Sequence, residues 1–156
     1  VKVNGQWYHN DVTWDDPANK TDPNYVRYNY FNVSDAEIIN KTHFPNTSYF
    51  TPPKCTATAD NYQIHYGLYA KSADEAIALI KSELTKASAE KRREIQVKVS
   101  SKAILDEVNK KLVDQQGIFT MIKDANKTVK NKFKEGTVTP AKDDNVLTMQ
   151  IVVEYQ

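Results

Sequence analysis

The sequence predicts an α+β fold, because two kinds of hydrophobic pattern alternate along its second part. After about residue 60, some short runs carry apolar residues at every second position, as strands do, and the segments between them carry apolar residues at helical spacing. Composition changes at the same place: eight of the nine tyrosines and both tryptophans lie before residue 70, and the remainder is rich in Lys, Ala, Ile and Val. We therefore predict two domains, residues 1–59 and residues 60–156.

The chain opens with a predicted β-hairpin. Asn4-Gly5 favours a two-residue turn in which both central residues have positive φ. Valines precede this turn and aromatic residues follow it, and both kinds of residue favour strands. Alternation along the second strand places Asp11 in mid-strand, on the same face as Trp7 and His9. A carboxylate there needs a partner, and a hydrogen bond to His9 along the strand is one possibility.

Residues Asp15–Asn24 predict a surface loop, because the segment contains two prolines and several Asp and Asn residues. Asp15, Asp16 and Asp22 could offer oxygen ligands to calcium. Their spacing does not match an EF-hand loop, however, and clustered aspartates with Pro and Asn are typical of an exposed turn. We therefore interpret this segment as a turn.

A short helix is predicted after Ser34, since Ser34 with Glu37 makes a capping-box pattern and Ile38 and Ile39 follow. Three prolines between residues 45 and 53 then exclude regular structure and predict an extended crossing to the second domain.

The hydrophobic pattern of the second domain predicts the order β-α-β-α-β. Ser72 with Glu75 and, later, Ser101 provide helix starts. Gly117 either ends the second helix or interrupts it, because the apolar stripe continues beyond it. This order favours a three-stranded sheet with helices packed on one face. The predicted elements are a strand over residues 62–70, a helix over 73–87, a strand over 95–99, a helix from residue 102 to 112 or beyond, and a strand over 147–155.

Composition excludes several classes of function. A formal net charge of +1 gives no basis for predicting a nucleic-acid partner. No apolar run approaches the roughly 20 residues that span a bilayer, so we predict no membrane span. Only four glycines are present and none cluster, which excludes a glycine-rich phosphate loop, and a single cysteine excludes an internal disulfide. We predict no cofactor.

Histidines and the cysteine give no obvious site. His9, His43 and His65 lie in three different predicted elements without the spacing of metal ligands, so no metal site is predicted. Cys55 follows two prolines and a lysine in an extended segment, with no helix start beside it. A free cysteine in such a place is usually a small buried apolar residue, and we interpret Cys55 as structural.

The opening segment resembles the transglutaminase-like superfamily, papain-related cysteine enzymes with a Cys-His-Asp triad. The likeness is to the bacterial branch, in which a Gly-x-Trp-Tyr hairpin leads into Asp-Val-Thr-Trp-Asp-Asp-Pro. The matching residues here are Gly5, Trp7, Tyr8 and the run Asp11–Pro17. Two later segments are also similar to that family, Tyr28–Asp35 to its aromatic strand and Ser-Asp helix start, and Thr51–Thr56 to its Pro-x-Cys-Thr segment.

The resemblance implies that residues 1–59 are the C-terminal part of a transglutaminase-like domain. Asp11 would be the triad acid that orients the catalytic imidazole. The histidine is expected a few residues before Val1 and the cysteine farther upstream, so the chain by itself should be inactive. Trp7 and Trp14 would line a peptide-binding cleft, pack in the core, or both. An ion pair that locks Asp11 to a base within this chain would overturn the interpretation as an enzyme remnant.

The function expected from this resemblance is hydrolysis of peptide amides, or acyl transfer, by the intact protein. The alternative is a non-catalytic binding or structural module of a bacterial secreted or cell-surface protein. Expected partners are the missing N-terminal part of the same protein, a peptide or cell-wall substrate, and a second copy paired through exposed strand edges. The expected location is outside the cell or in the cell envelope.

Overall fold

The computed structural model describes residues 1–16, 26–39, 43–44 and 47–156, and it has the predicted mixed α+β composition. The chain divides into two compact units, Val1–Gly67 (unit 1) and Leu68–Gln156 (unit 2). The division therefore falls after Gly67 rather than after residue 59. Most of the predicted loop Asp15–Asn24 lies outside the described residues. Among the helices that are described, none is long and apolar enough to cross a membrane.

Unit 1 begins with the predicted hairpin. Strands β1 (Lys2–Val3) and β2 (Gln6–Trp7) pair antiparallel. The turn residues Asn4 and Gly5 have φ values of 48° and 81°, as the sequence predicts for such a turn. Strand β3 (His9–Asn10) then pairs antiparallel with β4 (Phe31–Val33). The first strands are therefore very short and form two separate sheets.

The prediction that Asp11 lies in mid-strand is wrong. Asp11 is the N-cap of a single helical turn, α1 (Val12–Asp15), and its side chain accepts hydrogen bonds from the amides of Thr13 and Trp14. An aspartate offers the backbone this alternative to a strand ladder, because its short carboxylate reaches the first amides of a helix. The β-branched residues Val12 and Thr13 favour a strand, but the hydrogen bonds from the amides of Thr13 and Trp14 to Asp11 start a helical turn instead.

The Ser34–Glu37 capping box is confirmed at the start of α2 (Asp35–Ile38). The predicted strand over residues 62–70 is wrong in its first half, where α3 (Tyr62–His65) forms instead. The rings of Tyr62 and Tyr66 lie 4.7 Å apart, and residues four apart are neighbours on a helix. Residues four apart share a face in a strand as well as in a helix, so the spacing of Tyr62 and Tyr66 fits both periods, and the helical one applies here.

Unit 2 contains a four-stranded sheet with the order β5-β6-β8-β7. Strands β5 (Tyr69–Ala70) and β6 (Glu94–Val99) are parallel, and β8 (Thr148–Val152) is antiparallel to both β6 and β7 (Thr139–Asp143). The sequence analysis missed β7 and predicted only three strands. Its polar residues and Pro140 look like a loop, but an edge strand tolerates proline because one of its sides needs no partner.

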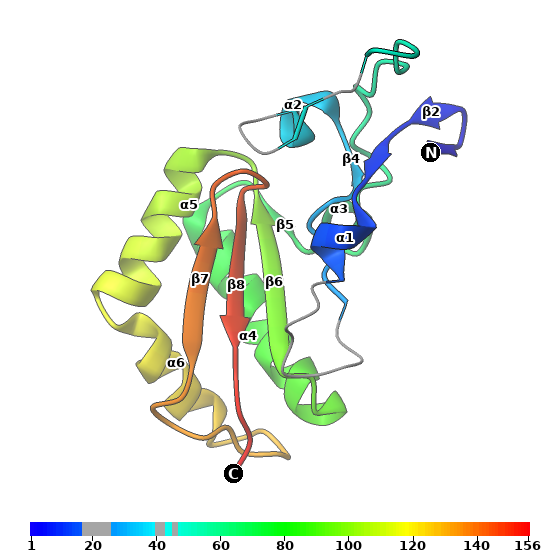
Figure 1. Cartoon of the computed structure of the whole chain (residues 1–156). Coiled ribbons are helices and arrows are strands. Elements are labelled where there is room, and N and C mark those ends of the chain that lie inside the picture. The colour runs from blue at the N-terminus through cyan, green and yellow to red at the C-terminus, as the bar shows by residue number, and fades with distance from the viewer. Residues whose placement is uncertain (17–25, 40–42, 45–46) are drawn as a thin grey trace. The chain divides into compact units, whose positions relative to one another are not determined.

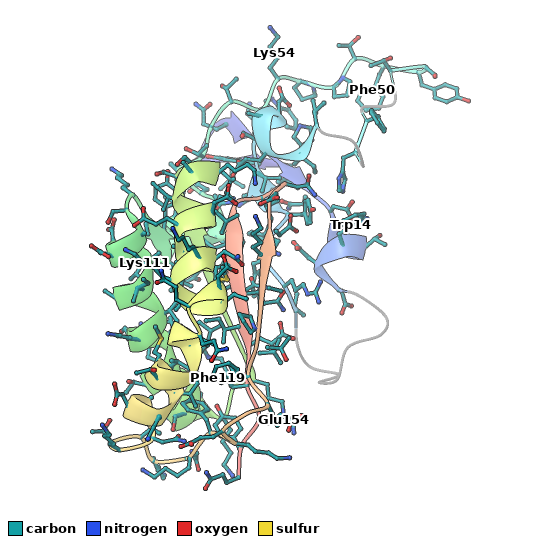
Figure 2. All side chains as sticks on the ribbon, turned by 90° about the vertical axis from the view of Figure 1, so that its left-hand side faces the viewer. Trp14, Phe50, Lys54, Lys111, Phe119 and Glu154 are labelled. Carbon is teal, nitrogen blue, oxygen red and sulfur yellow. The ribbon has the colours of Figure 1, made fainter. Side chains whose placement is uncertain are left out.

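The helices of unit 2 lie on one face of this sheet (Figure 1), and the view from the side shows the two layers (Figure 2). Ser72 caps α4 (Ala73–Glu90) and Ser101 caps α5 (Lys102–Asn109), both as predicted. A π-helical turn, η1 (Lys110–Asp114), leads to α6 (Gly117–Ala125). Gly117 therefore begins a new helix, after Gln116 with a φ of 56°.

The apolar core of unit 2 forms between these layers. Buried residues of α4, such as Ile80 and Leu84, meet alternate residues of β6 and β8, such as Val97 and Ile151. Burial of this kind is the main favourable contribution to folding. This core explains why the second part of the chain follows its hydrophobic periodicity closely.

Candidate functional site

Asp11 holds a fixed carboxylate at the start of α1. Its Oδ1 atom accepts the amide of Thr13 at 2.9 Å and the amide of Trp14 at 3.0 Å. Two bonds to one oxygen set the plane of the carboxylate and leave Oδ2 for another partner. An orienting acid of a triad needs such a fixed orientation.

The partner of that second oxygen is an imidazole from the same chain. Nε2 of His43 lies 3.0 Å from Oδ2 of Asp11. The imidazole is largely buried and contacts two aromatic rings, with centroid distances of 4.8 Å to Trp14 and 4.9 Å to Tyr30. Asp11 is thus in contact with a base of the same chain, and this contact is an ion pair when the imidazole of His43 is protonated. It is the contact that counts against the interpretation as an enzyme remnant.

The sequence analysis missed this role of His43. Asp11 and His43 are separated by 32 positions, and no periodic pattern or short motif links them. The expected hydrogen bond between His9 and Asp11 is not the one formed, because Nε2 of His9 lies 2.6 Å from Oδ1 of Asp35. Once β3 ends and Asp11 caps a helix, the two side chains no longer share a strand face.

Trp7 and Trp14 take different positions in unit 1. Trp7 lies in β2 with 41% of its surface exposed, and the ammonium of Lys2 stands 5.7 Å from its ring centre. Trp14 lies in α1 and is 45% exposed (Figure 2). Its ring meets that of Tyr30 edge-on at 5.5 Å. Neither tryptophan is a core residue, so the alternative prediction that these two side chains pack in the core is wrong. Trp14 adjoins Asp11 directly.

Asp15 anchors the other end of α1. Its carboxylate is buried and accepts the amide of Tyr30 at 3.0 Å. Burial raises the pKa of this carboxyl to about 6, although the backbone bonds it accepts act in the opposite direction. A buried acid that joins α1 to residues before β4 holds Asp11, Trp14 and Tyr30 in one group, so Asp15 is structural rather than a calcium ligand. Asp22 lies outside the described residues.

A second cluster joins His9, Asp35 and Cys55. Besides the contact between His9 and Asp35, the amide of Cys55 donates to Oδ2 of Asp35 at 3.1 Å, and the amide of Asp35 donates to the carbonyl of Cys55 at 2.7 Å. One potential ligand atom from each side chain lies within 4.8 Å of the others. The bond from His9 lowers the pKa of the Asp35 carboxyl, and the amide of Cys55 and the charge of Lys54 act in the same direction.

Cys55 does not have the environment of an activated nucleophile. The residue is 3% exposed, and burial together with the charge of Asp35 raises the pKa of its thiol. Activated cysteines are partly exposed and have a depressed pKa, because the thiolate is the nucleophile. The burial of Cys55 therefore argues against a catalytic nucleophile at this position and supports the interpretation of Cys55 as a structural residue.

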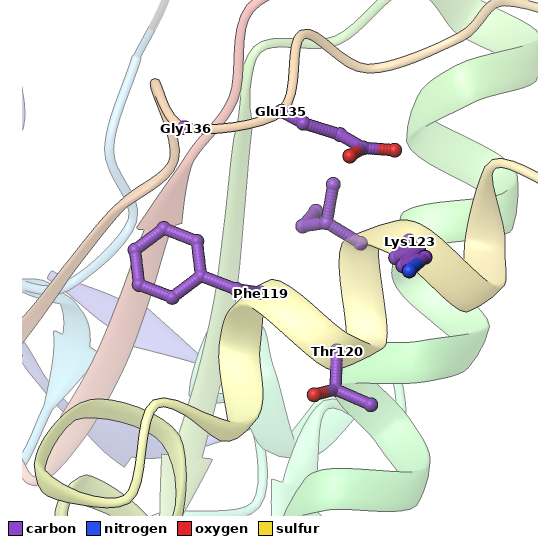
Figure 3. Close-up of a pocket in the computed structure, with 6 residues that line it drawn as sticks. Phe119, Thr120, Lys123, Glu135 and Gly136 are labelled. Carbon is purple, nitrogen blue, oxygen red and sulfur yellow. The ribbon is translucent and has the colours of Figure 1, made fainter.

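Two pockets are further candidate sites. One, of about 300 Å³, lies between α6 and the turn at Glu135 and Gly136 (Figure 3). Its lining combines the apolar side chains of Phe119 and Ile122 with the polar side chains of Thr120, Lys123 and Glu135. The other, of about 480 Å³, is in unit 1 and is lined by Val3, Asn4, Tyr28, Phe31, Asn32, Asp60, Tyr62, His65 and Tyr66. Neither includes Asp11.

Comparisons with known proteins add no family assignment. No family model matches the chain, and no curated protein matches it in sequence. The resemblance to transglutaminase-like enzymes therefore rests on the sequence motifs of residues 1–59 alone.

Proposed function

We propose that unit 1 is the C-terminal part of a transglutaminase-like cysteine enzyme and that Asp11 orients its catalytic imidazole. The intact protein would hydrolyse peptide amides or transfer their acyl groups to an amine. One observation carries this proposal: at the position where the sequence matches the triad acid, two backbone amides anchor one oxygen of the carboxylate and so fix the direction in which the other oxygen can hold an imidazole.

In such an enzyme a cysteine thiolate attacks the amide carbonyl, and the histidine transfers the proton to the leaving amine. Asp11 would accept the N–H of that histidine and so hold its tautomer and orientation. The cysteine and the histidine belong to the upstream part that the resemblance implies. Residues 1–156 supply the acid and, beside it, the exposed ring of Trp14.

His43 is the main competitor for Asp11. A carboxylate oxygen has two lone pairs, so Oδ2 of Asp11 can accept the upstream imidazole as well as His43. Alternatively, the upstream histidine displaces His43. In both cases the bonds from Thr13 and Trp14 keep the carboxylate in place.

The test uses the intact protein and the variant Asp11→Asn. Asparagine is as good an N-cap as aspartate, so α1 should still form, but the negative charge that holds the imidazole is lost. We expect turnover of a peptide amide to fall on the order of 10² to 10⁴-fold. His43→Gln and the neighbouring Asp16→Asn serve as controls and should each change turnover only a few-fold. Unchanged turnover in Asp11→Asn would remove Asp11 from the mechanism.

A second candidate function is a non-catalytic binding or structural module. The observation that favours it is that both oxygens of Asp11 are already used within the chain, by α1 and by His43. In that case Asp11→Asn and His43→Gln would both lower the stability of unit 1, and the intact protein would show no turnover to lose. A secreted or cell-surface location, the peptide or cell-wall substrate and self-association through strand edges stay predictions that only the resemblance and the sequence support.

A further inference from the structure

We propose that His9, Asp35 and Cys55 form a binding site for a divalent transition metal of the zinc class. Each residue contributes one ligand atom, and these atoms lie within 4.8 Å of one another. Imidazole, thiolate and carboxylate are the side chains that bind zinc in proteins. Three protein ligands would leave the fourth tetrahedral position to water or to another ligand.

The backbone holds this cluster in place. His9 is paired with Val33 between β3 and β4, and Asp35 follows that strand after one residue. Cys55 is tied to Asp35 by two bonds, because each of the two amides donates to an oxygen of the other residue. Three segments that are distant in sequence are therefore positioned by strand pairing and backbone bonds. Such a frame does not depend on a metal for its assembly.

The distances fit a small cation after modest side-chain rotation. Zinc lies about 2.0 to 2.3 Å from its ligands, so the ligand atoms of a tetrahedral site stand about 3.3 to 3.8 Å apart. Nε2 of His9 and Oδ1 of Asp35 would have to separate slightly from 2.6 Å, and the sulfur of Cys55 would have to approach them. The cation would replace the proton shared by His9 and Asp35, and the thiol proton would be released to solvent.

Burial and access are also suitable. The side chains of His9 and Asp35 are 24% and 31% exposed, so an ion can reach them from solvent. Cys55 closes the inner side, where its sulfur lies 3.5 Å from the carbonyl oxygen of Pro53. The positive charge of Lys54 acts on Asp35 and opposes the cation, but it sits on an exposed side chain that can move away.

The competing interpretation is purely structural. An ion pair between His9 and Asp35 would tie β3 to the start of α2, and Cys55 would fill space beneath it. That interpretation needs no metal and predicts that added metal changes nothing at these residues. The proposal is independent of the role of Asp11, because the two clusters share no residue.

The experiment titrates the 156-residue chain with Co²⁺ and then displaces the cobalt with Zn²⁺. We expect one equivalent of Co²⁺ to produce a thiolate-to-cobalt charge-transfer band in the near ultraviolet and the strong visible absorption of a tetrahedral ion. Zinc should abolish both signals. Cys55→Ser should remove the charge-transfer band, and His9→Gln should weaken binding at least tenfold.

His65→Gln is the matched control, because His65 is an exposed histidine of the same unit outside the cluster. It should leave both the spectrum and the affinity unchanged. Tryptophan fluorescence checks that each variant is folded. A weak octahedral spectrum without the charge-transfer band in the unmodified chain would overturn the proposal, and so would equal zinc affinity in the unmodified chain and the His9→Gln variant. The spectrum of the unmodified chain decides the matter even if a variant does not fold.

Discussion

The two units of this protein are stabilised in different ways. The core cluster of unit 2 consists of aliphatic side chains, Met and one Phe between a sheet and three helices. Among its described residues, unit 1 buries fewer apolar side chains, of which Tyr8 and Tyr30 are the largest, and it also buries Asp15, Asn29, Asn32, Ser34, Asn61 and Gln63. Long periodic elements thus generate an apolar core, whereas short elements depend on polar and aromatic contacts.

Side-chain amides act as cross-links in unit 1. Asn32 donates to the carbonyl of Asp60 at 3.0 Å, Asn61 to that of Phe31 at 3.4 Å, and Gln63 to that of Tyr28 at 3.2 Å. Within the part of the chain that the structure describes, the amide oxygens of these three side chains have no hydrogen-bond partner. A buried acceptor without a donor costs free energy, so these three cross-links stabilise unit 1 less than fully paired amides would.

The largest expected effect is in the core of unit 2. Leu84 is fully buried in α4, and Leu84→Ala removes apolar contacts and leaves a cavity. We expect the free energy of unfolding of unit 2 to fall by about 2 to 5 kcal/mol, measured by urea denaturation with far-ultraviolet circular dichroism. Val113→Ala, at a partly exposed position, is the control. A loss below about 1 kcal/mol at Leu84 would contradict the apolar core described above.

Tryptophan fluorescence sharpens the same test, since both tryptophans belong to unit 1. If each unit depends on its own contacts, Leu84→Ala should shift the fluorescence transition less than the dichroism transition. Equal shifts would show that the two units unfold together.

An intermediate effect is expected where α6 begins. A Cβ atom at Gly117 would lie 2.5 Å from the carbonyl oxygen of Lys111, and this oxygen belongs to the backbone. Gly117→Ala should therefore lower the stability of unit 2 by about 1 to 3 kcal/mol, as seen in thermal denaturation. The neighbouring Gln116→Gly should have the opposite sign or no effect, because Gln116 has positive φ. A neutral Gly117→Ala variant would mean that η1 and α6 can separate easily.

The smallest effect is a pH dependence of unit 1. The pKa of Asp15 is about 6 in the folded protein, against 3.8 for an unperturbed aspartate. The folded state therefore binds the carboxyl proton more tightly than the unfolded state does. The ionised carboxylate therefore destabilises unit 1 above about pH 6, and this cost disappears as the pH falls toward 4. Allowing for partial solvent screening, the cost at pH 7 is about 1 to 2 kcal/mol.

Asp15→Asn tests this pH dependence because asparagine keeps an oxygen that can accept the amide of Tyr30. The stability of the variant relative to the unmodified chain, followed by fluorescence, should decline between pH 7.5 and pH 4.5 as the aspartate takes up its proton. A constant difference over this range would show that Asp15 is ionised throughout.

Prediction from sequence succeeded where periodic patterns were long. The stripe of α4 and the alternation of β6 and β8 predicted their elements, because burial of one face decides the structure of such segments. In unit 1 the elements are two to four residues long, and single side chains decide them. The cap formed by Asp11 and the helix at Tyr62 are of this kind.

The site was harder to predict than the fold. A local motif pointed to Asp11 as a candidate, but its contact with His43 and the approach of Cys55 to His9 connect distant positions through loops. Contacts of this kind have no characteristic spacing that could be recognised in a single sequence. The polar edge strand β7 was missed for a related reason, since Pro140 and its neighbours lack the pattern that burial on one face would impose.

The order of strands in unit 2 also determines how the protein responds to mechanical tension. The last strand, β8, is not at an edge but lies between β6 and β7, and it pairs with each of them over five residues. A pull on Gln156 along the chain would load the middle of the sheet through Tyr155, whose hydroxyl also donates toward the carbonyls of Ala87 and Arg92. Extraction of this strand has to break two ladders rather than one, so force applied at this end is shared across the sheet.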